Sequence, residues 1–125
     1  MAIGMLEVQG FSIALEAADA MCKAANITIE AFDANNPTSA DVKIPVIVQV
    51  KIQGGISDVT AALETGRRVG EQYFPASEVI TDCIPAAAEE IMPLITSGKL
   101  KPTQKNKEIR ASENNKGSKK SKAQE

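Results

Sequence analysis

Two hydrophobic periods follow one another along the first four fifths of the chain, and their order restricts the fold to very few topologies. Apolar side chains recur every second residue in some segments, as in half-buried strands, and every three to four residues in others, as in helices. The predicted elements are strands at 2–9, 27–33, 44–53 and 78–84 and helices at 11–25 and 58–73. This order predicts an α+β fold, a ferredoxin-like βαββαβ antiparallel sheet with two main helices on one face.

The loops and the last element complete this arrangement. A polar stretch at 34–43, ANNPTSADVK, predicts a loop, and 85–95 predicts a short C-terminal helix that ends near Pro93. The sheet face without helices is left uncovered, which favours assembly of several copies. Alternation places these residues on one face of their strands: Ile27, Ile29 and Ala31; Ile44, Val46, Val48, Val50 and Ile52. It places these on the other: Thr28, Glu30 and Phe32; Pro45, Ile47, Gln49, Lys51 and Gln53.

The first predicted helix is unusually rich in alanine, so that it can lie close to a sheet. Its apolar stripe is expected to hold Phe11, Leu15, Ala18, Cys22 and Ala25, with Ala14, Ala17, Met21 and Ala24 beside it. Lys23 lies four residues after Asp19, the spacing of an exposed ion pair worth roughly 0.2–0.5 kcal/mol on a helix surface. Cys22 and Cys83 are expected to be small buried hydrophobic residues.

The second predicted helix carries two glycines on its apolar side. Its stripe comprises Val59, Ala62, Leu63, Gly66, Gly70 and Tyr73. Each glycine costs about 1 kcal/mol relative to alanine inside a helix, which a close approach to a neighbouring backbone could offset. Ser57 is the predicted N-cap.

Charge divides the chain into a domain at 1–98 and a tail at 99–125. The domain has five basic and thirteen acidic side chains, net −8, whereas the tail has nine basic and three acidic ones, net +6. The tail has almost no apolar residues and cannot bury enough surface to offset the entropy of ordering it. We therefore expect it to be disordered.

The composition argues against an enzyme. The chain has no histidine, which removes the usual acid–base group at neutral pH, and its two isolated cysteines cannot form a zinc site. We therefore expect no catalytic residue, no metal and no cofactor. The start of the chain lacks the basic and apolar regions of a signal peptide, and no apolar run approaches a membrane span, so neither secretion nor membrane insertion is expected.

Residues 3–25 carry a more specific pattern, IGMLEVQGF followed by EAADAMCKAA. The pattern resembles the start of bacterial microcompartment shell proteins, the single-domain, hexamer-forming family of carboxysomes and of diol- and ethanolamine-utilisation compartments. AFD at 31–33, VITDCIP at 79–85 and EEIMP at 89–93 also fit that family, so the resemblance covers about residues 2–94. It implies a structural subunit in a shell in the bacterial cytoplasm, forming a cyclic homohexamer that meets other shell proteins edge to edge.

The resemblance also implies where assembly contacts lie. Lys23 matches a lysine at the hexamer edge, as an alternative to the plain surface pair with Asp19. Family members follow their last strand with Arg-Pro-His, and here those positions are Ala86, Ala87 and Ala88. The arginine that helps to lock hexamers together is therefore missing at Ala86. This departure leaves two alternatives for the chain, a minor component among standard tiles or a member of mixed hexamers.

The loop between the second and third strands lines the central pore in the family. Here it is longer and lacks the family's glycine- and serine-rich turn, and an ordinary solvated loop is the alternative. The pore-lining candidates are Asn35, Asn36, Pro37, Thr38 and Ser39, flanked by Asp41 and Lys43. Six-fold repetition would turn each charge into a ring that biases which small metabolites pass.

Two further alternatives stay open. The tail is either a solubilising extension or a binder of acidic cargo or shell surfaces; a lysine-rich run without aromatic residues is weak support for nucleic-acid binding. The whole domain could instead be a trimeric ferredoxin-like regulatory module that binds a small effector between subunits.

Overall fold

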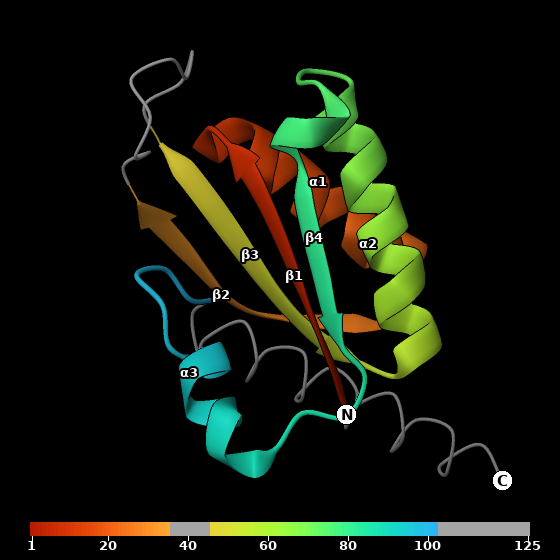
Figure 1. Cartoon of the computed structure of the whole chain (residues 1–125), viewed down its shortest axis with the longest axis vertical. Coiled ribbons are helices and arrows are strands. Elements are labelled where there is room, and N and C mark those ends of the chain that lie inside the picture. Colours follow the sequence, from red (N-terminus) through yellow and green to blue (C-terminus); the bar gives the residue numbers. More distant parts are fainter. Residues whose placement is uncertain (36–45, 103–125) are drawn as a thin grey trace, which may run out of the picture.

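The computed structural model describes residues 1–35 and 46–102 and has the predicted topology. Its four strands are all antiparallel to their neighbours, in the order β2-β3-β1-β4, so β2 and β4 form the two edges of the sheet (Figure 1). The α+β, ferredoxin-like prediction is confirmed. The elements are β1 (Ala2–Gln9), α1 (Phe11–Ala24), β2 (Ile27–Asn35), β3 (Ile47–Gly54), α2 (Ile56–Glu71), β4 (Ile80–Ile84) and α3 (Met92–Thr96), with 3-10 turns at Ala76–Glu78 and Glu89–Ile91.

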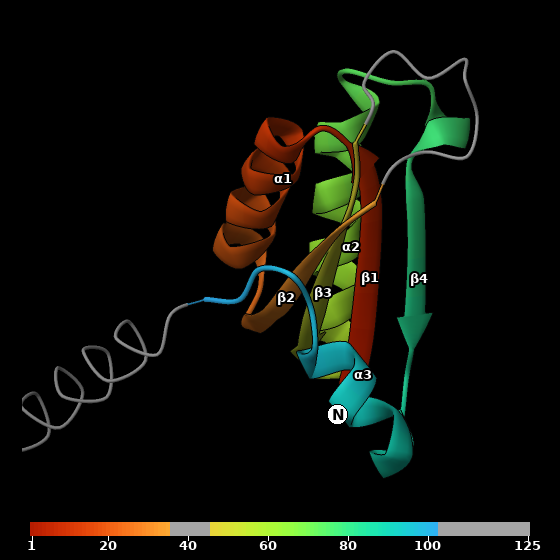
Figure 2. The ribbon, with the colours of Figure 1, turned by 90° about the vertical axis from the view of Figure 1, so that its left-hand side faces the viewer.

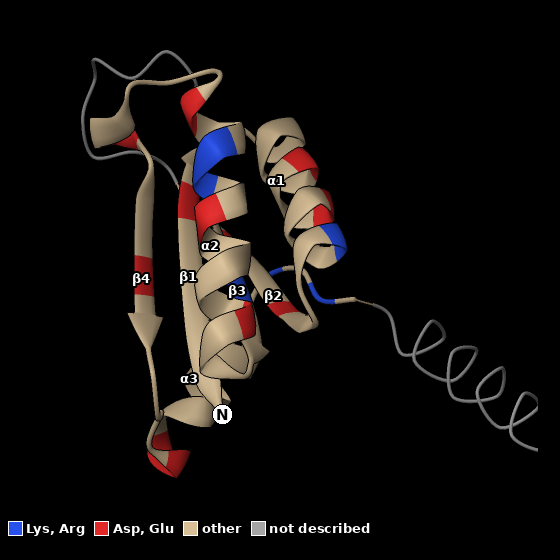
Figure 3. Ribbon diagram, turned by 90° about the vertical axis from the view of Figure 1, so that its right-hand side faces the viewer, with Lys and Arg blue, Asp and Glu red and all other residues tan. Residues whose placement is uncertain are grey.

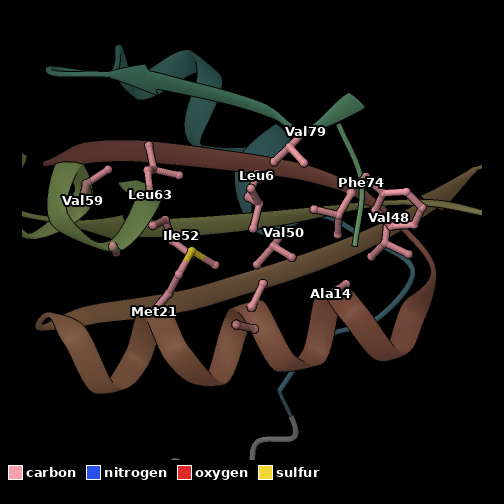
Figure 4. Packing of buried hydrophobic residues seen from close by; sticks show 14 of the residues in the cluster. Leu6, Ala14, Met21, Val48, Val50, Ile52, Val59, Leu63, Phe74 and Val79 are labelled. Atoms are coloured by element: carbon pink, nitrogen blue, oxygen red, sulfur yellow. The ribbon is translucent and has the colours of Figure 1, made fainter. Parts of the chain in front are cut away.

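The core lies between the sheet and the pair α1 and α2, which pack side by side on one sheet face (Figures 2 and 4). Val48, Val50 and Ile52 of β3 are fully buried there, as their alternation predicts. Gly10, with a φ of 85°, lets the chain turn from β1 into α1. The other sheet face is partly covered, because α3 and the residues after it pack against β2 and β3.

The buried stripe of α1 is displaced from the predicted one: Ala18 of that stripe is buried, together with Ala14, Ala17 and Met21, which were expected beside it. The fully buried residues are Ala14, Ala17, Ala18 and Met21. Phe11 and Leu15 are 41% and 47% exposed, and Cys22 is exposed as well. The helix turns the flank with its three alanines and Met21 to the sheet, because small side chains allow close packing, and Phe11 and Leu15 remain at its side. The prediction of buried cysteines is also wrong, since Cys83 is only half-buried.

A β-bulge divides β2 and reverses its alternation. Ile29 pairs with Ile52, but Ala31 pairs with Lys51, so Glu30 is the extra residue. Phe32 therefore shares a face with Ile27 and Ile29 and packs against the core, with its ring 6.0 Å from that of Phe11 in an edge-to-face contact. The predicted faces of Ala31 and Phe32 are exchanged.

The glycines of α2 allow close packing, although the close neighbours are side chains and not a backbone. A Cβ atom on Gly66 would lie 2.7 Å from the Met21 sulfur and 2.9 Å from Leu6 Cδ2. The helix begins one residue before Ser57, with Gly55 as the N-cap, so the predicted cap is wrong. Tyr73 lies beyond the end of α2 and is 51% exposed, so it does not belong to the buried stripe.

The C-terminal helix begins, and does not end, near Pro93. Proline is tolerated in the first turn of a helix, where its missing N–H would have no partner in any case. The chain then continues to residue 102 along the outer edge of β2. Residues 103–125, which make up most of the predicted tail, lie outside the described residues.

Candidate assembly surfaces

The end of α1 presents Lys23 to solvent. Its ammonium group lies 2.7 Å from Asp19 Oδ2, and the two side chains are 75% and 62% exposed. The hydrogen bond from Lys23 to Asp19 raises the pKa of the lysine, so it carries its charge throughout the neutral range. The surface ion pair that the four-residue spacing of Asp19 and Lys23 predicted is therefore present. The exposed ammonium group is also accessible to a neighbouring molecule.

The turn after β4 presents Ala86, the position where the resemblance implies an arginine. Ala86 is exposed, and the backbone N–H of Ala87 donates to the carbonyl of Met1 at 3.4 Å. A methyl group here offers no donor to a neighbouring molecule.

The predicted pore residues lie almost entirely outside the described residues. Asn35 is exposed at the end of β2, opposite Ile47. The other lining candidates Asn36, Pro37, Thr38 and Ser39, and the flanking residues Asp41 and Lys43, fall in 36–45 and are not described.

A buried lysine on the sheet face opposite α1 and α2 ties the C-terminal segment to the sheet. Lys51 is 7% exposed, and its ammonium group donates to Asp33 Oδ2 at 2.8 Å, to the Leu94 carbonyl at 3.0 Å and to the Ser97 carbonyl at 2.9 Å. The two carbonyls belong to the end of α3, where a cation is favoured. The hydrogen bond from Lys51 lowers the pKa of the Asp33 carboxyl group despite its partial burial.

Residues 97–102, which we name the strap, follow the edge of β2. The N–H of Phe32 donates to the Leu100 carbonyl at 2.8 Å, and the N–H of Leu100 donates back to the Phe32 carbonyl at 3.1 Å. Lys99 Nζ donates to the carbonyl of Ala34. The strap occupies an edge that could otherwise pair with another chain.

Sequence reasoning did not find the strap or Lys51. The sequence shows only that Lys51 lies on the polar side of a strongly apolar strand. This position does not reveal its role, because the hydrogen-bond partners of Lys51 lie 18, 43 and 46 residues away in the chain.

A groove of about 300 Å³ lies at the other edge of the sheet, between α2 and β4. Leu63, Cys83, Glu64 and Asp82 are among the residues that line it, and Asp82 Oδ1 accepts a hydrogen bond from the backbone N–H of Cys83 at 2.9 Å. Arg67 lies within the groove but is occupied, because it donates to Glu71 Oε1 at 3.3 Å and to the Thr81 hydroxyl at 3.1 Å.

The described residues contain no group of three or more histidine, cysteine, aspartate or glutamate side chains that could hold a metal ion. None of the helices in this part of the chain is both long enough and apolar enough to span a bilayer.

Comparison with protein families gives one matching model, the BMC domain, over residues 2–85. Carboxysome shell protein CcmK3 of Halothece sp. is 29% identical over 104 residues, which are 81% of this chain and 94% of that protein. Bacterial microcompartment shell protein PduK of Salmonella typhimurium is 37% identical over 71 residues, 57% of this chain. The match spans only 40% of PduK.

Among solved structures, a microcompartment protein from Desulfitobacterium hafniense has the same fold. The TM-score is 0.58 at 23% sequence identity, over 82% of this chain and 50% of that one. At this identity the likeness concerns the fold alone.

Proposed function

This chain belongs to the BMC-domain family and is a subunit of a bacterial microcompartment shell, and from this premise we propose that six copies form a ring around a central pore for small metabolites. Members of this family are structural shell proteins and not enzymes. The observation that carries the proposal is the family match over residues 2–85, which includes the α1 motif with its exposed lysine. The two sides of the sheet, the β2 side that the strap lines and the β4 side next to α2, are the candidate lateral surfaces for such a ring.

The pore is proposed to form where β2 ends and β3 begins. Asn35 is exposed at this end of the sheet, and the connection that leaves it holds the remaining pore candidates, Asn36 to Ser39 with Asp41 and Lys43. If the six copies meet at this end, Asp41 and Lys43 each become a ring of like charges that selects among charged metabolites.

The edge contact between rings is proposed to be weaker than in most of the family. Lys23 is available for it, but Ala86 replaces an arginine whose charge-assisted hydrogen bonds could contribute about 1.5–3 kcal/mol at each contact. The chain would then serve as a minor component or enter mixed hexamers, with other shell proteins as its neighbours.

The basic tail is proposed to bind acidic surfaces. Its net charge of +6 contrasts with −8 on residues 1–98, so acidic cargo proteins or the acidic faces of shell subunits fit it by charge.

The native mass of the full chain, measured by native mass spectrometry or light scattering, tests the ring. A mass of six chains supports the proposal, whereas a monomer or a trimer contradicts it and favours an effector-binding module. A second chain that ends at residue 102 separates the tail from the ring. It retains the strap, which a chain ending at residue 98 would lose.

A further inference from the structure

The strap and the groove lie at opposite edges of one sheet. The strap follows β2, and the groove lies between α2 and β4, with β3 and β1 between them. When one side of a molecule binds the opposite side of the next copy, the contact is heterologous and can repeat until a ring closes. These two surfaces are therefore placed as the two halves of such a contact.

The charges of the two surfaces are complementary. Lys99 and Lys101 of the strap are exposed, while Glu64 and Asp82 line the groove. Figure 3 shows blue segments in the chain beside β2, red on β4, and both red and blue segments on α2. Arg67 in the groove is paired with Glu71, which leaves Glu64 and Asp82 as the acidic residues of the lining.

The apolar parts of the two surfaces also correspond. Leu100 is held by its backbone to Phe32, and the residue is 46% exposed, so part of its apolar surface is free to contact a neighbouring chain. The groove offers Leu63 and the half-buried Cys83 as apolar lining. Its volume of about 300 Å³ suits a side chain and a short extended segment, not a helix.

We propose that the strap of one subunit docks into the α2–β4 groove of the next copy of this chain, with Leu100 facing Cys83 and with Lys99 and Lys101 facing Glu64 and Asp82. This inference rests on the proposed ring and names its lateral interface. Lys51 then has a further role, because it positions the strap from which the contact is made.

Disulfide formation between Cys83 and a cysteine introduced at position 100 tests this interface. In a Cys22→Ser background, Leu100→Cys is oxidised under mild conditions and analysed on a denaturing gel without reductant. The two positions cannot join within one chain, because roughly 14 Å of sheet separates β2 from β4 and a disulfide needs Cα atoms within about 7 Å. We expect a ladder of linked chains up to the hexamer.

Two controls accompany it. Replacing Cys83 by serine in the same variant should abolish the ladder. Leu94→Cys is the matched control, since Leu94 is 67% exposed but lies on α3 outside the strap, and it should not link to Cys83.

Native mass separates the possible failures. A hexamer without cross-links between positions 100 and 83, or with equal linking from position 94, overturns the interface and leaves the proposed function standing. The absence of any hexamer in the wild-type chain overturns the proposed function itself. Reversing the charges gives an independent measure. Lys101→Glu should weaken the ring, so that it dissociates at a higher protein concentration than the wild type. Adding Asp82→Lys to that variant should reverse the change.

Discussion

At the scale of single residues, Lys51 has the most demanding environment among the described residues that carry charge. A buried ammonium group is tolerated only when its protons are accepted, and here three acceptors surround it. One comes from β2 and two come from the end of α3. The residue therefore joins parts of the chain that share no element of secondary structure.

Replacing Lys51 by methionine should release the C-terminal segment while leaving the helix-side core in place. The change removes three hydrogen bonds and leaves Asp33 without its cation, so we expect a loss of about 1–3 kcal/mol in the free energy of unfolding. Urea denaturation at fixed protein concentration measures this. Trypsin should also cleave faster after Lys99, which the strap geometry otherwise protects.

Asp33→Asn is the control for the lysine variant, because it keeps an acceptor at nearly the same place. It should lose less stability and retain the protection of Lys99. Equal proteolysis of the wild type and the methionine variant would contradict the role given to Lys51.

The stability contributed by Asp33 should depend on pH in one direction only. Because its pKa is lowered in the folded chain, the unfolded chain binds more protons between the folded pKa and the ordinary value of about 3.9. Asp33 therefore contributes its full stabilisation when the pH is above the ordinary pKa of the unfolded chain. This stabilisation is lost as the pH falls through the lowered pKa of the folded chain. The free energy of unfolding should therefore fall more steeply below about pH 4 in the wild type than in Asp33→Asn. Parallel curves for the two proteins would rule this out.

At the scale of elements, sequence periodicity predicted the strands and helices but not their local irregularities, such as a β-bulge. Alternation placed Val48, Val50 and Ile52 correctly because β3 is regular and central. It failed in β2, where a bulge at Glu30 shifts the register, since nothing in a period of two indicates an inserted residue. In α1 it did not identify the buried side, because apolar residues recur at helical spacing on two neighbouring sides of the helix. Which of these sides is buried depends on how closely the helix can approach the sheet.

Gly98 should be essential for the strap to follow β2. A Cβ atom at this position would lie 2.7 Å from Ala31 Cβ and 2.9 Å from the carbonyl oxygen of Phe32, and neither neighbour can move independently of the strand. Gly98→Ala should therefore displace the strap and increase amide hydrogen exchange at Phe32 and Leu100, whose N–H groups pair there. Exchange in the buried strand β3 should stay unchanged.

Gly55→Ala is a suitable comparison for the Gly98 variant. Its Cβ atom would meet only Asp58 Oδ2 at 3.6 Å, an ordinary contact distance. Unchanged exchange at Phe32 and Leu100 in Gly98→Ala would show that the strap tolerates a side chain there.

At the scale of the whole molecule, the family and the exposure of Lys23 could be anticipated, but the strap and the groove could not. Lys23 belongs to a contiguous motif on one helix, which a sequence displays directly. The groove and the strap each combine residues from segments far apart in the chain. Cys83 and Leu63 meet across α2 and β4, and Leu100 reaches Phe32 only after α3 has reversed the chain.

The alanine at position 86, where the resemblance implies an arginine, gives a prediction about tiling. If hexamers form but their edges bind weakly, Ala86→Arg should restore a donor at an exposed turn and produce flat sheets in electron micrographs at concentrations where the wild type shows few. Adding Lys23→Ala should remove the sheets again without changing the native mass, because Lys23 is exposed and makes only a surface ion pair within its own chain. Ala88→Arg, at an exposed position in the same turn, tests whether any added cation suffices. Sheets of equal extent from the wild type and from Ala86→Arg would mean that this edge needs no arginine, and the chain would then tile by itself and not as a minor component.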